Sequence, residues 1–188
     1  WTDVIKNFTQ TEIHDNFSEN LHPFLFEKIK SFLKEDEFDI RCVDALQKQF
    51  FERPFAKAKE FASEINDRLK QEGVFSLKTA LVPYRRAKNL TQNVPILPIN
   101  EKLFATDAEK NLYKKILIVE KEVEKHLDQD DFKSYLNSLQ GLTKSLAELF
   151  DNVMINDPDL DLKHNRIALL HKICTLYERH ANFSLIQV

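Results

Sequence analysis

One short basic segment contains the residue types best suited to binding chemistry. It reads PYRRAKNL, spans residues 83–90 and brings Arg85, Arg86 and Asn89 together. Arg85 and Asn89 are four positions apart, which places them on one side of a helix, and Lys78 lies earlier on that side. Guanidinium and amide groups bind phosphates and the edges of nucleic-acid bases. The segment therefore favours RNA binding, with an ordinary solvated helix face as the alternative.

A tyrosine within this segment leaves two interpretations open. Tyr84 directly precedes Arg85. An exposed tyrosine at this point would stack on an unpaired RNA base. A tyrosine that faces inward would instead belong to the core.

A second candidate lies at the start of the last expected helix. Lys163, Asn165 and Arg166 stand together there. The free amide groups and positive dipole end of a helix N-terminus favour an anion, and these side chains would add donors. The alternative is that Arg166 pairs with Asp159 or Asp161 nearby. Both interpretations stay open.

Catalytic and metal-binding patterns are missing from the sequence. Histidines and a cysteine lie on or near the last expected helix, at His164, His171, Cys174 and His180. A structural zinc site needs four ligands, usually from two segments, and no second cluster is present. There is no GxSxG motif, and two isolated glycines cannot form a phosphate-binding loop. We therefore predict no catalytic residue, no metal site and no cofactor in this chain.

Composition limits the kind of RNA binding that is possible. The chain has 188 residues, with 27 Lys and Arg against 30 Asp and Glu, for a net charge of −3. Any RNA-binding surface must therefore be a local patch.

The two cysteines show no paired spacing, which favours the reducing cytoplasm. The sequence shows no apolar run of membrane length and no signal peptide, and because it begins at Trp1 we expect a fragment of a longer protein.

The expected elements are helices. Two glycines offer few tight turns, and apolar residues recur at helical spacing along most of the chain. We predict an all-α bundle. Prolines at 95 and 98 mark a linker, which divides the bundle into an N-terminal helical part, 1–94, and a C-terminal helical part, 95–188.

Helix starts are predicted from capping residues. Asp39 and the capping box Thr106–Glu109 are suited to begin helices, and another helix starts near Ser76. Pro83 lies inside that last helix, so we expect a kink or an early break there.

The C-terminal segment of the sequence, residues 150–187, resembles the β subunit of bacterial-type glycyl-tRNA synthetases. That family has a Phe-Asp-x-Val-Met-Val element, an acidic stretch, an Asn-Arg-Leu-Ala-Leu-Leu helix and an Ala-Asp-Phe-Ser-like ending. The corresponding segments here are Phe150–Ile155, Asn165–Leu170 and Ala181–Ser184. The sequence departs from the pattern with Ile at 155 and 167 and with Asn at 182.

Other segments agree with the family in the same order. FLFEKIKSFLKEDEFDIRCVDAL resembles the Phe-x-x-x-Arg-Leu helix and the helix that follows it, with Lys28 in place of Arg. YRRAKNL resembles Phe-Lys-Arg-Val-x-Asn-Ile, and EKLFATDAEKNLYKKI resembles the Leu-Phe…Ala-Glu-x-x-Leu-Tyr segment. The resemblance covers about residues 21–187.

The resemblance implies a role in aminoacylation. In that family this region is an all-α bundle resembling the anticodon-binding domain of arginyl-tRNA synthetases, and it holds the anticodon end of tRNA. Catalysis, with ATP and Mg²⁺, belongs to the α subunit or to a fused α region, in a cytoplasmic α2β2 tetramer or fused dimer. The chain would thus be the tRNA-binding part of a glycine–tRNA ligase and would carry no catalytic site itself.

These expectations combine into one hypothesis for the site. Arg85, Arg86 and Asn89, with Lys78, form one wall around the anticodon loop, and Lys163, Asn165 and Arg166 form the other, with an amide from Asn152. An anticodon ending in two cytosines needs both donors and acceptors from its reader. Phe150, Val153 and Met154 are expected to be packing residues.

The alternative from another functional class is a non-catalytic helical scaffold or subunit-interaction module. Such a module would bind its partner through exposed Phe and Leu side chains. Phe51, Phe55 and Phe75 are the candidate contacts.

Overall fold

The structure, a computed structural model, describes residues 15–73 and 76–186. This part of the chain is helical and contains no strand, so the predicted all-α class is confirmed. The elements are α2 (Asp15–Glu35), α3 (Ile40–Ala45), α4 (Gln47–Glu52), α5 (Phe55–Lys70), α6 (Leu77–Thr91), η1 (Glu101–Leu103), α7 (Asp107–Asp128), α8 (Phe132–Gln140), α9 (Thr143–Asn152), α10 (Leu160–Glu178) and η2 (Phe183–Leu185). Within the described ranges, no helix is both long enough and apolar enough to cross a bilayer.

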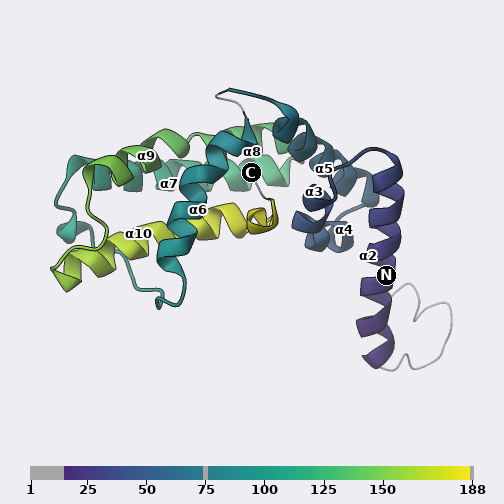
Figure 1. The fold of residues 1–188 in the computed structure, drawn as a ribbon, viewed down its shortest axis with the longest axis horizontal. Helices are drawn as coiled ribbons and strands as arrows, with labels where there is room; N and C mark the ends of the chain where they lie inside the picture. Colours follow the sequence, from purple (N-terminus) through teal and green to yellow (C-terminus); the bar gives the residue numbers. More distant parts are fainter. Residues whose placement is uncertain (1–14, 74–75, 187–188) are drawn as a thin grey trace.

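The helices form two groups along the long axis of the molecule (Figure 1). The helices α6 to α10 make up one group, in which α10 packs on α6 and α7, and α7 packs on α8 and α9. The helices α2 to α5 lie at the other end. The short η2 turn after α10 contacts α3, so the end of the described chain lies between the two groups.

The core is built around α10. Ten of its nineteen residues are buried, which is the pattern of a central helix rather than of a surface one. The apolar stripe of α7 packs toward it and toward α8 and α9, and the predicted stripe residues are all buried: Leu112, Ile116, Val119, Val123 and Leu127. The predicted inward residues of the last helix are buried as well: Ile167, Leu170, Cys174 and Tyr177.

The predicted helix starts are confirmed by capping hydrogen bonds. Asp39 accepts from the amide of Arg41, and Ser76 accepts from the amide of Lys78. Thr106 and Glu109 form both halves of the capping box. Each cap satisfies an amide that the helix itself leaves unpaired.

The expected early break at Pro83 does not occur. The helix α6 continues past it to Thr91. A proline inside a helix removes one backbone hydrogen bond and costs about 3 kcal/mol. Tyr84, directly after the proline, and Ala87, one turn later, are fully buried, and their packing keeps the helix continuous.

The segment between α6 and α7 is the extended connection that its prolines predict, but it is held against the bundle. The Nε2 atom of His171 is 3.1 Å from the carbonyl oxygen of Val94, and Asn165 binds the backbone of Asn100. The helix α6 packs on α9 and α10, on the far side of the predicted 94/95 division. That division stays a prediction about the chain.

Candidate nucleic-acid interface

A groove of about 640 Å³ lies between α6 and the connection from α9 to α10. We call it the α6–α9 groove. One wall consists of Val82, Arg85, Arg86, Asn89 and Leu90 on α6, and the other of Phe150, Val153, Met154, Ile155 and Asn156. The predicted basic cluster of α6 therefore faces a hollow with polar and apolar groups on both sides.

The guanidinium group of Arg86 is the most clearly presented cation of this groove. Its central carbon lies 4.3 Å from the centre of the Phe150 ring, and Arg86 is exposed to solvent. A cation–π contact uses the flat face of the guanidinium group. Its N–H edges therefore stay available for a phosphate or a base.

Two further predicted residues share this exposed face of α6. Asn89 is exposed at the groove, one helical turn after Arg86. Lys78 is exposed near the start of the helix, two turns before Arg85. The side of α6 that carries them thus presents positive charge and an amide to solvent.

Arg85 is half-buried, and its guanidinium group is held by the backbone after α10. Its Nη2 atom donates a hydrogen bond to the carbonyl oxygen of Ile186. Lys88, the remaining cation of the segment, is 2.7 Å from a carboxylate oxygen of Glu178. The charge of Lys88 is therefore already paired within the bundle.

Tyr84 belongs to the core, so the interpretation that it stacks on a base is wrong. Its ring is fully buried and stacked on Tyr177, with the centres 4.8 Å apart. Its hydroxyl donates to Glu178 at 2.6 Å. Burial and this hydrogen bond raise the pKa of Tyr84 far above its ordinary value.

Arg166 lies inside the fold and does not present its charge to solvent as the two-wall hypothesis requires. Only 5 % of its surface is exposed. Its Nε atom donates to Glu109 at 2.8 Å, and its Nη1 atom donates to Asp157 at 2.6 Å. The carboxylates are not Asp159 and Asp161, the partners named by the alternative interpretation. A buried guanidinium group needs such partners to offset its loss of hydration.

Asn165 is also turned inward, which contradicts its expected place on a groove wall. Its side-chain oxygen Oδ1 accepts a hydrogen bond from the backbone N–H of Asn100 at 2.7 Å, and its Nδ2 atom donates to the backbone carbonyl of Asn100 at 3.1 Å. This reciprocal pair holds the end of the extended connection. Both donor and acceptor of the side chain are therefore used within the fold.

The N-terminus of α10 is not an open anion site. The carboxylate of Asp159 accepts hydrogen bonds from the amides of Asp161 and Leu162. The helix dipole is thus already matched by a negative group, and Asp157 and Asp161 add further negative charge nearby. Lys163 is half-buried in this acidic surrounding.

One residue of the second predicted cluster reaches the groove indirectly, through a backbone oxygen. The Nη1 atom of Arg166 donates to the carbonyl oxygen of Met154 at 2.9 Å, and Met154 lines the α6–α9 groove. The same guanidinium group binds Glu109, which forms the capping box of α7. Arg166 therefore supports one groove wall from below.

Sequence reasoning missed Met154 as a surface residue. Its side chain is 60 % exposed at the groove, whereas Phe150 and Val153 are buried as expected for packing. Ile155, which separates Met154 from the polar turn 156–159, is buried, so the local pattern gave no signal that Met154 alone is exposed. Asn152, the last residue of α9, is exposed, and its Nδ2 atom donates to the carbonyl of Glu148 at 2.8 Å.

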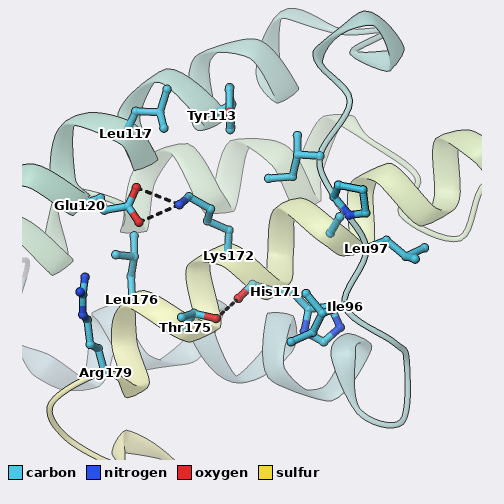
Figure 2. A pocket seen from close by; sticks show the side chains of 13 residues that line it. Ile96, Leu97, Tyr113, Leu117, Glu120, His171, Lys172, Thr175, Leu176 and Arg179 are labelled. Carbon is cyan, nitrogen blue, oxygen red and sulfur yellow. Dashed lines mark hydrogen bonds and ion pairs between the residues drawn. The ribbon is translucent and has the colours of Figure 1, made fainter.

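A second hollow, of about 630 Å³, lies between the extended connection and the helices α7 and α10 (Figure 2). Its lining is largely apolar, from Ile96 and Leu97 to Leu117. The Nζ atom of Lys172 lies 2.7 and 2.8 Å from the two oxygens of Glu120. The charge of Lys172 is therefore already paired within the bundle.

The cysteines have the surroundings of packing residues rather than of nucleophiles. Burial raises the pKa of Cys42 to about 12 and that of Cys174 to about 11, so neither is a thiolate at neutral pH.

Over residues 15–73 and 76–186, no three His, Cys, Asp or Glu side chains come together as a metal site would require.

Comparison with known proteins identifies the fold. A sequence model of the DALR anticodon binding domain matches residues 81–178, which is more than half of the chain. The chain belongs to the DALR anticodon-binding domain family. The match runs from α6 to the end of α10 and so includes both walls of the groove.

Relatives of this DALR domain extend the similarity over nearly the whole chain. The glycine–tRNA ligase β subunit of Thermodesulfovibrio yellowstonii is 26 % identical over 93 % of this chain and 25 % of its own length. Those of Rickettsia felis and Rickettsia peacockii are 32 % and 30 % identical over 85 % and 95 % of this chain, and over 23 % and 26 % of their own lengths. The DALR domain chain therefore spans about a quarter of these relatives.

Proposed function

We propose that this chain is the anticodon-binding part of a glycine–tRNA ligase β subunit and that it holds the anticodon loop of glycine tRNA in the α6–α9 groove. One observation carries the proposal. Arg86 presents its guanidinium group, stacked on Phe150, inside the part of the chain that matches the anticodon-binding family. Of the residues predicted to bind RNA, this proposal keeps as contacts those whose side chains reach solvent, and it excludes the buried Asn165 and Arg166.

The groove supplies the groups that an unpaired loop requires. Arg85 and Arg86 attract the phosphate backbone, together with Lys78, which lies outside the groove near the start of α6, and the amide of Asn89 suits a base edge. The exposed side chain of Met154 gives an apolar surface for a splayed base. In this proposal Arg166 and Asn165 act indirectly, by holding the opposite wall and the adjacent connection, and Asn152 stays a candidate contact at the rim.

The parent enzyme supplies the chemistry in this proposal. ATP and Mg²⁺ are bound by an α subunit or a fused α region, and the assembly is an α2β2 tetramer or a fused dimer in the cytoplasm. The relatives are β subunits and are about four times as long as this chain, which supports a division of labour. The present chain contributes binding of the anticodon end, and no catalytic step is assigned to its residues.

Filter binding tests the proposal. We expect Arg86→Ala to weaken binding of glycine tRNA, with an unchanged melting temperature because the side chain is exposed. Loss of one phosphate contact lowers the slope of log affinity against log salt by about 0.7–0.9. If Arg86 instead reads a base, its loss relaxes the preference for cytosine by about 1–3 kcal/mol.

Lys34→Ala is a matched control, because Lys34 is an exposed cation on α2, in the other group of helices. It should leave the affinity unchanged. Equal weakening by both variants, or equal affinity for a tRNA whose anticodon cytosines are replaced, would contradict the proposal.

A second candidate function has its own observation. A largely apolar hollow of about 710 Å³ between α2, α4 and α5 is lined by Phe51 and Phe55, two of the residues named for a scaffold. Phe75, the third, lies outside the described residues. A protein-binding role for this face is compatible with RNA binding at the distant groove.

A further inference from the structure

The described chain ends in a short segment that is packed into the molecule. Residues 181–186 follow α10 and contain η2, and we call them the C-terminal strap. Phe183 and Ile186 are fully buried. The Phe183 ring meets Tyr177 edge to face, with centres 6.1 Å apart, and Tyr177 stacks on Tyr84 of α6. The strap is therefore anchored in the same aromatic cluster that fixes α6.

The strap is also attached to the other group of helices. The amide of Asn182 donates to the carbonyl of Ala45, the last residue of α3, at 2.7 Å. The strap thus bridges α3 and α6, which are far apart in the sequence (Figure 1).

The strap ends on a residue of the α6–α9 groove. The carbonyl oxygen of Ile186 accepts the hydrogen bond from Nη2 of Arg85. Arg85 directly precedes Arg86 and lines the groove. A hydrogen bond to a charged donor is stronger than one between neutral groups and fixes the direction of a flexible side chain.

We propose that the C-terminal strap is a positioning element for RNA binding, which fixes the orientation of Arg85 and couples the groove to α3 without touching the RNA. The inference rests on the proposed function of the groove. The proposal gives the backbone groups of the strap, the Asn182 N–H and the Ile186 carbonyl, a role in binding besides their role in stability. It also assigns different tasks to two adjacent arginines: Arg86 is presented by Phe150, and Arg85 by the strap.

Two variants at Asn182 separate the effect of its backbone hydrogen bond to Ala45 from the effect of its side chain. Asn182→Pro removes the amide that binds Ala45, at a φ of −81° that proline tolerates, whereas Asn182→Ala keeps the amide. We expect Asn182→Pro to shift and broaden the nitrogen NMR signal of the Arg85 guanidinium group in the RNA-free chain. It should also weaken binding of the anticodon arm of glycine tRNA about threefold or more. Asn182→Ala should change neither. Phe183→Ala, checked for folding by circular dichroism, is a second way to loosen the strap.

A double-mutant cycle with Arg85→Ala decides whether the strap acts through Arg85. Loosening the strap should cost no further affinity once Arg85 is absent. If the two losses add in full, or if the Arg85 signal is unchanged in both strap variants, the inference is overturned. If the signal moves but neither Arg85→Ala nor Arg86→Ala affects RNA binding, the proposed function fails while the strap still orients Arg85.

Discussion

At the scale of single residues, neighbours in the sequence differ widely in what they offer to a ligand. Tyr84 is in the core, Arg85 is half-buried, Arg86 is exposed, and Lys88 is paired with Glu178. Helical geometry turns successive residues by about 100°, so a basic run cannot act as one surface. Only the residues whose direction matches the groove are candidates for RNA contact.

The stacked arrangement of Arg86 predicts that charge alone is not sufficient. Arg86→Lys keeps the positive charge but loses the planar group that lies on Phe150 and its paired donors. We expect this variant to bind glycine tRNA more weakly by about 0.5–1.5 kcal/mol, the net contribution of one hydrogen bond, because an ammonium group cannot offer the two parallel donors of a guanidinium group. The measurement is tRNA affinity at fixed salt, and full retention of affinity in the lysine variant would show that only the charge matters.

His180 predicts a pH dependence of stability. Burial, with the charges of Arg179 and Arg53, lowers the pKa of His180 from its ordinary 6.5 to about 4 in the folded chain. The unfolded chain therefore takes up a proton below about pH 6.5 that the folded chain rejects, so stability falls as the pH drops from 6.5 toward 4.

Urea unfolding at two pH values, above and below 6.5, measures this effect. His180→Asn should lose less stability between them than the unaltered chain does. An equal loss in both would mean that other groups control the pH response.

At the scale of elements, the buried guanidinium group of Arg166 joins three of them. Arg166 lies on α10 and binds Glu109, the capping residue of α7, together with Met154 and Asp157 of the connection between α9 and α10. Removing one member of a buried charge cluster leaves the others uncompensated. The cluster therefore holds the groove wall at Met154 in one place.

We expect Arg166→Met to destabilise the chain by about 3–5 kcal/mol, because Glu109 and Asp157 lose their partner. Urea unfolding gives the free energy directly. Lys110→Met, at an exposed site beside Glu109 on α7, is the matched control and should have little effect. Unchanged stability of the Arg166 variant would contradict the structural role assigned to it.

Periodicity and caps predicted the helices well, because both depend on local sequence. Thr106 and Glu109 cap α7 as expected, and the stripe from Leu112 to Leu127 is buried. The errors came from partners distant in sequence. Arg166 meets Glu109, fifty-seven positions away, as well as Asp157 nearby, and Tyr84 meets Tyr177, so local patterns could not decide between the interpretations left open for these side chains.

At the scale of the whole molecule, the two ends present different surfaces. The α6–α9 groove offers cations and polar groups, whereas the hollow between α2, α4 and α5 is lined mostly by apolar side chains. Phe32 and Phe55 stay 51 % and 42 % exposed beside each other, with ring centres 6.1 Å apart. Large exposed aromatic side chains gathered in one place are typical of contact surfaces.

This difference predicts separable variants. Changing Phe32 and Phe55 together to serine should lower the binding of an apolar fluorescent dye and leave tRNA affinity unchanged, since the groove lies in the other group of helices. The melting temperature should fall only slightly, because each ring is already about half exposed, although Phe55 packs beside the buried Phe50. A parallel drop in tRNA affinity would mean that the two surfaces are coupled.

The central position of α10 has a consequence for how the chain is made. Ribosomes release α6 to α9 first, yet the apolar faces of these helices are completed by a helix that emerges only later. Until α10 emerges, the nascent chain exposes apolar surface that is prone to aggregation and that chaperones recognise. Slowing translation just before the codons of α10 should therefore lower the soluble yield.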